Sequence, residues 1–148
     1  MIGTYWPYLF AIGIGVGLTV QVGMNSTVGR VLGSPLWAAV ANFAVGLAAL
    51  LACSIVTGTR VSGTTVGHVP SWAWFAGLLG ATFVIGTTVL GPRIGALALL
   101  AFVLAGQLVA SLLVDQFGVL GFPRAPVTAG RLVGAVLLVT GALLVLRR

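Results

Sequence analysis

The chain has 148 residues, of which 59% are hydrophobic and 5% are charged, and its formal net charge is +6. About a quarter of the residues of a soluble domain are charged, so a soluble globular protein is excluded. A nucleic-acid-binding protein is excluded as well, because the arginines are dispersed among loops and helix ends and form no basic face.

Five apolar segments follow one another along the chain, and each is long enough to cross a lipid bilayer, which takes roughly 20 helical residues. We therefore expect an all-α membrane protein whose five transmembrane helices form a single domain over residues 1–148. The predicted helices cover residues 7–32, 35–57, 71–90, 94–117 and 128–146.

The first predicted helix carries a narrow polar stripe, because residues spaced by four share one helix face. Gln21 in this stripe lies about 3 Å along the axis from the middle of the helix. The segment has no basic residues before it and no small-residue cleavage site, so we do not expect a cleaved signal peptide. The stripe consists of Gly13, Gly17, Gln21 and Asn25.

The connections between the predicted helices are short. Gly33-Ser34-Pro35 marks an end and a start, because glycine ends a helix, serine can cap the next one and proline suits its first turn. Gly91-Pro92-Arg93 is expected to join the third and fourth helices tightly. Residues 58–70 form the longest connection, and residues 118–126 join the last two helices.

Amide side chains stand at similar depth in three predicted helices, since Asn42 lies ~6 Å and Gln107 ~3 Å from the middle of its helix. An uncharged amide in hydrocarbon needs hydrogen-bonding partners. The amides either hold helices together, at ~0.6–2 kcal/mol each, or line a midplane cavity that binds a polar solute. The shared depth favours the cavity. The candidate substrate-binding residues are Gln21, Asn25, Asn42 and Gln107.

Asp115 is the single carboxylate of the chain. It lies ~15 Å past the middle of the fourth predicted helix, at the membrane interface, where an ionised side chain is tolerated. Arg131 begins the fifth predicted helix on the same side, and Arg124 lies in the connection between them. We expect Asp115 to pair with one of these arginines and to fix the helical hairpin. A role in proton coupling is the alternative.

Gly130 and Gly134 are spaced by four on the fifth predicted helix, and Gly141 continues the series. Such a spacing lets two helices approach closely. The partner is either another helix of the same subunit or a helix of a second copy.

The arginines divide almost evenly between the two sides of the membrane. Orientation normally follows an excess of Lys and Arg in cytoplasmic loops, and five crossings place the termini on opposite sides. The balance predicts insertion in both orientations and an antiparallel pair, and a single orientation set by a weak bias is the alternative. The side of the N-terminus has Arg60, Arg124 and Arg131, and the other side has Arg30, Arg93, Arg147 and Arg148.

No constellation of residues suited to enzyme chemistry appears in the sequence. Cys53 is the one cysteine and His68 the one histidine, so neither a cysteine metal cluster nor an intrachain disulfide can form. A second carboxylate for acid–base work and a phosphate-binding loop are also lacking. We expect no catalysis, no metal and no cofactor.

Short motifs over nearly the whole chain resemble one family. The first half has Gln21-x-x-x-Asn25, Gly29, Gly33-Ser34-Pro35 and Ala41-Asn42-Phe43 with Gly46. The second half has Gly91-Pro92-Arg93-Ile94-Gly95, Ala105-Gly106-Gln107, Leu113-Val114-Asp115-Gln116-Phe117-Gly118 and Gly130-x-x-x-Gly134 with Gly141-Ala142. The pattern resembles the YdcZ-like proteins, a five-helix family of the drug/metabolite transporter superfamily.

The resemblance implies a multi-pass protein of the cell inner membrane that corresponds to half of a ten-helix transporter. Such a half-transporter would pair as an inverted dimer, with itself or with a sister chain. The implied function is export of a small organic solute through a midplane cavity between the inverted subunits. Its partners would be the solute and the lipid bilayer, with no nucleic acid.

One departure from the wider superfamily concerns the first helix. The small multidrug exporters use a membrane-embedded glutamate there to exchange protons and drug. This chain has only Gln21 and Asn25 in that helix, so their mechanism does not carry over.

Two other functions stay open from the sequence. Opposed subunits with a ring of amides would suit a dual-topology channel for a small ion or solute. A half-subunit or scaffold that transports nothing without a partner chain would share the same features. Saturable counter-transport distinguishes the carrier from the channel, and co-purification of a second protein would favour the scaffold.

Overall fold

The computed structural model describes residues 2–146, which form helices and contain no β-strand. This architecture confirms the predicted all-α membrane protein. The chain divides into two compact units, Met1–Arg93 and Ile94–Arg148. Arg147 and Arg148, which enter the count of arginines, lie outside the described residues. Assembly of the units into a single five-helix domain stays a prediction.

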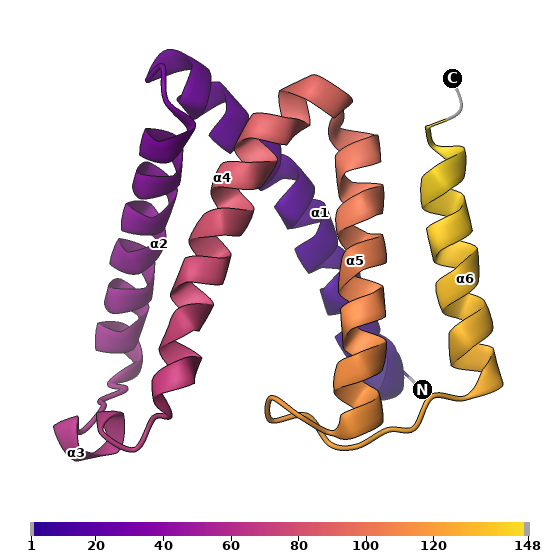
Figure 1. Ribbon diagram of the computed structural model, residues 1–148. Coiled ribbons are helices and arrows are strands. Elements are labelled where there is room, and N and C mark those ends of the chain that lie inside the picture. The colour runs from indigo at the N-terminus through magenta and orange to yellow at the C-terminus, as the bar shows by residue number, and fades with distance from the viewer. Residues whose placement is uncertain (1, 147–148) are drawn as a thin grey trace. The chain divides into compact units, whose positions relative to one another are not determined.

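Two long helices, α1 (Ile2–Val31) and α2 (Pro35–Thr57), form an antiparallel hairpin in the first unit (Figure 1). The turn is the one that the sequence predicts. Gly33 adopts the left-handed conformation with φ +67°, and the hydroxyl of Ser34 accepts a hydrogen bond of 3.4 Å from the backbone N–H of Trp37. Pro35 occupies the first turn of α2.

Helix α1 begins at Ile2, ahead of the predicted start at residue 7. Pro7 therefore lies inside the helix, where it has no N–H to donate to the preceding turn. The missing hydrogen bond lies near the N-terminal end of α1, so it weakens only the first turns of the helix.

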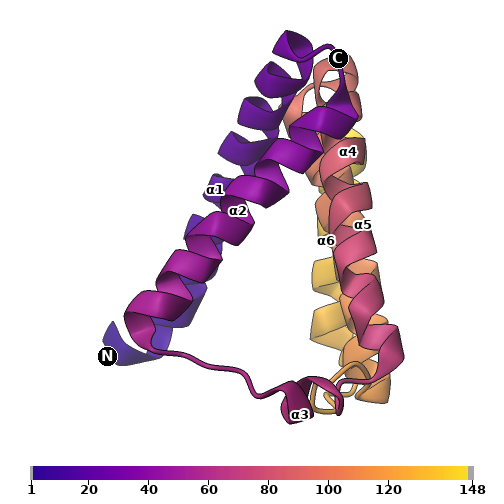
Figure 2. The ribbon, with the colours of Figure 1, turned by 90° about the vertical axis from the view of Figure 1, so that its left-hand side faces the viewer.

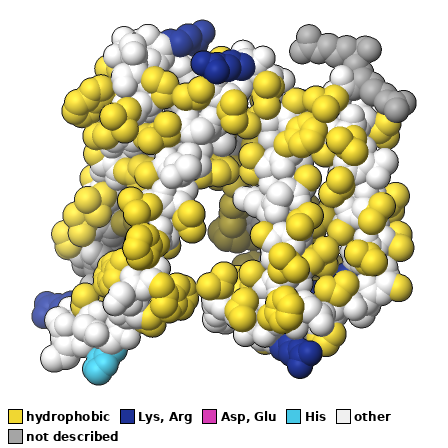
Figure 3. All heavy atoms as spheres, in the orientation of Figure 1, with side chains coloured by type: hydrophobic (Ala, Val, Ile, Leu, Met, Phe, Trp, Pro, Cys, Tyr) yellow, Lys and Arg dark blue, Asp and Glu magenta, His cyan; other side chains and the backbone are white. Residues whose placement is uncertain are grey.

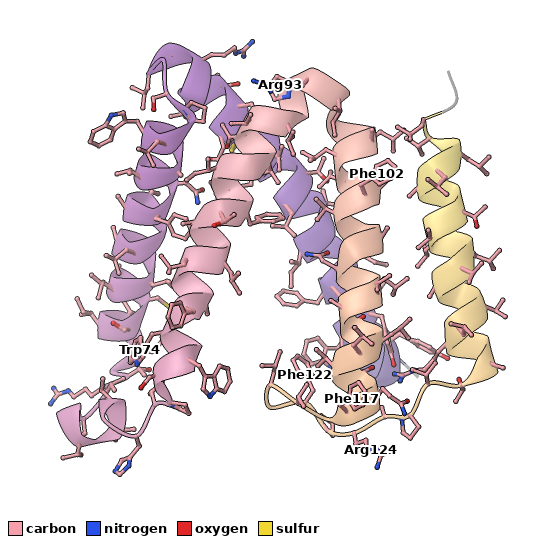
Figure 4. The ribbon with its side chains drawn as sticks, in the orientation of Figure 1. Trp74, Arg93, Phe102, Phe117, Phe122 and Arg124 are labelled. Atoms are coloured by element: carbon pink, nitrogen blue, oxygen red, sulfur yellow. The ribbon has the colours of Figure 1, made fainter. Side chains whose placement is uncertain are left out.

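The connection after α2 contains a short helix that the sequence did not predict, α3 (Gly63–Val66). A 3₁₀ turn, η1 (Ser71–Phe75), then leads into α4 (Ala76–Ile94). Trp74 lies at this lower end of α4, as a tryptophan at the membrane interface would (Figure 4).

The predicted break at Gly91-Pro92-Arg93 is wrong, because α4 continues through Pro92 to Ile94. The chain turns instead at Gly95, whose φ of +83° is a conformation that side-chain-bearing residues rarely adopt. Pro92 stands in the last turn of α4, so its missing N–H interrupts only the end of the helix.

Helix α4 converges with the α1–α2 pair at the end where the Gly33 turn lies (Figure 2). At this end Thr88 is buried, and its methyl group would lie 3.2 Å from a Cβ atom added at Gly29 of α1. Such a close approach of two helices requires a small residue. Gly29 supplies it.

The second unit is a hairpin of α5 (Ala96–Phe117) and α6 (Ala129–Leu144), which lie side by side in Figure 1. Gly118 ends α5 with φ +62°, and the hydroxyl of Thr128 caps α6 by accepting from the N–H of Arg131. Both ends agree with the predicted boundaries within a residue. Small side chains make the contact, since Ala135 and Ala142 are buried.

Within residues 2–146, four helical segments are long and apolar enough to cross a membrane: Tyr5–Val31, Pro35–Thr57, Ser71–Ile94 and Ala96–Phe117. The fifth, α6, has 16 residues and is ~24 Å long at ~1.5 Å per residue. It is therefore shorter than the ~30 Å thickness of a hydrocarbon core.

The described residues bury very few side chains. Large apolar side chains are exposed along the helices, and on the face in Figure 3 they cover the helices between arginines that lie toward the two ends of the helices or in the connections there. A water-soluble protein does not expose apolar surface on this scale. These faces therefore meet lipid, the other unit of the chain or another subunit.

Candidate functional site

Two amide side chains meet between α1 and α2. The Nε2 atom of Gln21 donates a hydrogen bond of 3.1 Å to the Oδ1 atom of Asn42, and both side chains are partly buried. In a bilayer, where water is absent, this bond satisfies a donor and an acceptor whose exposure to lipid would be costly. Two of the predicted site residues therefore lie in direct contact.

Asn25 follows Gln21 by one turn of α1, and its side chain is only 6% exposed. The hydrogen bonds among the described residues do not engage its amide. Every fully buried polar side-chain atom in the described part of the chain does have a partner. The Asn25 amide is therefore not sealed in the helix contact but reaches the open space beside it.

That space is a groove of about 720 Å³ between α1 and α2. Gln21, Asn25 and Asn42 supply its polar groups, and no charged residue lines it. The rest of the lining is apolar: Met24 and Val28 from α1, and Ala38, Ala41, Phe43, Val45, Gly46, Leu47 and Leu50 from α2.

The sequence prediction did not name these apolar lining residues. Two of them could have been predicted from the spacing of the amides on α1. Met24 and Val28 stand three residues after Gln21 and Asn25, so they share that face of α1. The lining from α2 could be found only once Asn42 was known to face Gln21.

The chemistry of the groove depends on the hydrogen-bond donors and acceptors of the amides that remain free. After their mutual bond, Gln21 retains its Oε1 acceptor and Asn42 its Nδ2 donors, and Asn25 has both kinds of group. A mostly apolar groove with a few convergent donors and acceptors is typical of small-molecule sites. It contains no carboxylate or guanidinium that could neutralise an ion.

Gln107, the fourth predicted amide, lies on α5 in the second unit. Its side chain is exposed, and none of the hydrogen bonds in the described part of the chain engages it. The structure brings together three of the four predicted residues. A shared site that includes Gln107 stays a prediction.

Asp115 and Arg131 form an ion pair across the hairpin of the second unit. Nη2 of Arg131 lies 3.0 Å from Oδ2 of Asp115, and both side chains are partly exposed. Nη1 of the same arginine donates to the backbone carbonyl of Ala125 at 2.9 Å. Arg131 therefore ties the end of α5 to the loop as well as to α6.

Arg124, the other candidate partner of Asp115, makes a different contact. Its Nε atom donates to the backbone carbonyl of Gln116 at 3.2 Å, and its place in the loop after α5 is visible in Figure 4. The side chain of Gln116 in turn accepts a bond of 2.8 Å from the N–H of Val127. The loop is thus held by several bonds besides the ion pair.

The glycine series on α6 does not form the contact with α5. A Cβ atom added at Gly130, Gly134 or Gly141 would meet nothing within 4 Å. The contact uses the neighbouring residues Ala135 and Ala142 instead, which are buried. Within the described residues, the glycine face of α6 is open.

Cys53 is exposed, and the described residues include no cluster of three or more His, Cys, Asp and Glu side chains that could hold a metal ion. The groove between α1 and α2, with its three amide side chains, is therefore the best candidate for a functional site.

Comparison with known proteins agrees with a membrane transport role. The family model described as "Putative inner membrane exporter, YdcZ" matches residues 6–144. The chain is 34% identical over 142 residues to Inner membrane protein YdcZ of Escherichia coli (strain K12), a match that covers 94% of this chain and 93% of the relative. No solved structure matches the chain. Together with its apolar spans, this relationship makes the protein a multi-pass protein of the inner membrane. The chain belongs to the YdcZ family of inner-membrane exporters.

Proposed function

We propose that this protein exports a small, uncharged organic solute, and that Gln21, Asn25 and Asn42 bind the solute in the groove between α1 and α2. The observation that carries the proposal is the Gln21–Asn42 contact. It places two amides with spare hydrogen-bonding capacity on an open groove, next to a third amide that has no partner among the described residues.

The absence of charge in the groove lining is what supports an uncharged solute. Transfer of an ion from water to an apolar site costs far more than transfer of a hydrogen-bonding neutral group. A cation would need a carboxylate, and the one carboxylate of the chain already lies 3.0 Å from Arg131. A neutral solute with donors and acceptors could instead exchange its bonds to water for bonds to the amides.

A second subunit would complete the cavity. The groove is open along one side, and the large apolar side chains around it are exposed, including Met24 and Leu47. We propose that an inverted copy or sister chain covers it, since transporters commonly bind substrate near the midplane between inverted repeats. In that assembly Gln107 of α5 would add a fourth amide to the cavity, and the open glycine face of α6 would suit the seam.

Uptake into proteoliposomes tests the proposal. Purified protein is reconstituted and a panel of neutral, cationic and anionic organic solutes is offered, with and without a pH gradient. We expect saturable transport of one or more neutral solutes and none of the cations. Transport confined to charged solutes would contradict the neutral-solute proposal, and single-channel currents would indicate a pore.

Substitution then connects transport to the groove. Gln21→Leu and Asn42→Leu should each abolish saturable transport, because each removes a groove amide. Thr19→Val is the matched control on α1, since the Thr19 hydroxyl bonds only to the carbonyl of Gly15 in its own helix. If Thr19→Val lost as much transport as Gln21→Leu, the groove would not be the binding site.

A further inference from the structure

Two arginines line one hollow at the end of the first unit where α1, α2 and α4 converge. Arg30 is in the last turn of α1 and Arg93 in the last turn of α4, and the hollow between them has a volume of about 340 Å³. Figure 4 shows Arg93 at this end of α4, and Figure 3 shows arginine side chains next to one another there. The other lining residues are Ser26, Gly29, Gly33, Pro35, Thr88, Val89 and Pro92.

The first unit has no carboxylate side chain that could neutralise these two charges. Residues 1–93 contain neither Asp nor Glu. The one carboxylate of the chain, Asp115, belongs to the second unit and is already paired with Arg131 at 3.0 Å. Two like charges that line one hollow at the edge of a low-dielectric region repel each other, and an anion bound between them would offset that repulsion. No Asp or Glu side chain of this unit can supply the anion.

The guanidinium groups also have unused donors. Arg30 makes one side-chain hydrogen bond, from Nη2 to the hydroxyl of Thr27 at 3.3 Å, and the bonds among the described residues do not engage the side chain of Arg93. The hydrogen bonds among the described residues join neither guanidinium to a carbonyl at the end of α1, where the Gly29 and Arg30 carbonyls accept from the N–H groups of Ser34 and Gly33. Each guanidinium therefore still offers a fork of donors suited to phosphate oxygens.

The remaining lining explains why the arginines would dominate recognition. The hydroxyl of Ser26 donates to the carbonyl of Val22 at 2.8 Å, and that of Thr88 donates to the carbonyl of Val84 at 2.7 Å. Both hydroxyl protons are thus committed to their own helices. The other lining side chains are apolar or glycine, so the hollow would accept an anionic group joined to an apolar remainder.

We propose that Arg30 and Arg93 bind a phosphate group in this hollow, and that the phosphate belongs to an anionic membrane lipid. The chemistry required is a phosphate with a net negative charge, because only the two guanidiniums supply free donors. Both arginines stand at helix ends, where lipid headgroups lie, which favours a lipid phosphate over a free one. This site is separate from the groove between α1 and α2 and does not depend on the transport function.

The test measures lipid retention by the full chain. Protein purified in detergent is mixed with phosphatidylglycerol, phosphatidylcholine or inorganic phosphate, and bound molecules are counted by native mass spectrometry. We expect the wild-type protein to retain phosphatidylglycerol over phosphatidylcholine. Arg30→Gln and Arg93→Gln should each weaken this retention by about tenfold or more, the size expected for loss of charge-assisted hydrogen bonds.

Arg60→Gln is the matched control, since Arg60 is exposed in the connection after α2 and does not line the hollow. It removes the same charge and should leave retention unchanged. Equal weakening by Arg60→Gln, or equal retention by wild type and the Arg30→Gln, Arg93→Gln double variant, would overturn the proposal. Binding of inorganic phosphate with the same arginine dependence, without lipid retention, would keep the phosphate site and overturn its lipid source.

The variants Arg30→Lys and Arg93→Lys keep the net charge and guard against a failure of the glutamine variants to fold. Lysine presents a point charge without the planar fork, so phosphatidylglycerol retention should fall below wild type while helix content by circular dichroism stays the same. Full retention by both lysine variants and by whichever glutamine variants fold would also overturn the proposal.

Discussion

The side chains of Gln21 and Asn42 are joined by a hydrogen bond of 3.1 Å between α1 and α2, and the same two side chains line an open groove. The two interpretations of the intramembrane amides are therefore not exclusive. One bond holds the helices together, while the remaining amide groups are available to a solute. Opening or exchange of this bond by a solute would change the contact between the helices.

The first prediction concerns the strength of that bond. Gln21→Leu and Asn42→Leu should each lower the free energy of unfolding, and the double variant should cost less than the sum of the two. The expected coupling energy is ~0.6–2 kcal/mol, the range for hydrogen bonds between membrane helices. Unfolding in mixed detergent micelles, followed by tryptophan fluorescence, gives the values. Thr19→Val combined with Asn42→Leu should be additive, and additivity of the Gln21 pair would contradict the bond.

The second prediction concerns access to the groove. Cysteines placed singly at the groove positions 21, 25 and 42, and at position 107, which would join the cavity in the proposed dimer, should react in a Cys53→Ala background with a small polar thiol reagent from the aqueous phase. Cysteines at Leu18 and Val109, outside the groove lining, should react slowly. Equal protection at the four amide positions would mean that the amides serve packing alone.

The polar stripe on α1 and the turn at Gly33 could be predicted from the sequence because they depend on local chemistry. A spacing of four places Gln21 and Asn25 on one face of any helix, and a Gly-Ser-Pro sequence suits a helix end followed by a start. The family relationship was also evident from short motifs, and it is confirmed by the match over residues 6–144.

Features that depend on contacts between helices were harder to predict from the sequence. The helix break moved from Gly91–Arg93 to Gly95, since α4 continues through Pro92 to Ile94 and the left-handed φ of +83° falls on a glycine, which adopts it without a steric cost. The pairing of Gln21 with Asn42 depends on the rotation of α1 against α2, which no spacing within one helix determines. The hollow between Arg30 and Arg93 likewise depends on where α4 meets α1.

The third prediction tests the turn after α5. Gly118 has φ +62°, and a Cβ atom there would lie 2.9 Å from Cβ of Arg124, so Gly118→Ala should destabilise the hairpin by about 1 kcal/mol or more. Gly106→Ala is the control within α5, since an added Cβ meets nothing within 4 Å. It should leave stability unchanged or raise it by about 0.5–1 kcal/mol. Thermal unfolding in detergent compares the two, and equal effects would contradict the left-handed turn.

The fourth prediction concerns orientation in the membrane. In the predicted five-crossing topology the arginines of the sequence divide as three against four between the two sides, so a reporter fused to the C-terminus should be active on both sides of the inner membrane. Two arginines added to the loop of residues 58–70 should then force one orientation. A wild-type reporter found wholly on one side would argue against an inverted homodimer and in favour of a sister chain as partner.

The last prediction separates a structural role of Asp115 from a role in proton coupling. Asp115 of α5 pairs with Arg131 of α6 at 3.0 Å, and the loop between these helices is also held by bonds from Arg131 to Ala125 and from Val127 to Gln116. Because both charged side chains are partly exposed, the pair contributes only about 0.2–1 kcal/mol. Asp115→Asn should therefore lower the free energy of unfolding slightly and leave the response of transport to an imposed pH gradient intact.

The measurement is transport by wild-type and Asp115→Asn protein, reconstituted at matched amounts with and without the gradient. Arg131→Gln is the matched control, because it removes the same ion pair and keeps the carboxylate. If the pair is structural, both variants should keep the wild-type response to the gradient, and Arg131→Gln should lose at least as much stability as Asp115→Asn because it also removes the bond to the Ala125 carbonyl. An Asp115→Asn protein that folds normally but no longer responds to the gradient, while Arg131→Gln does, would make Asp115 the coupling group.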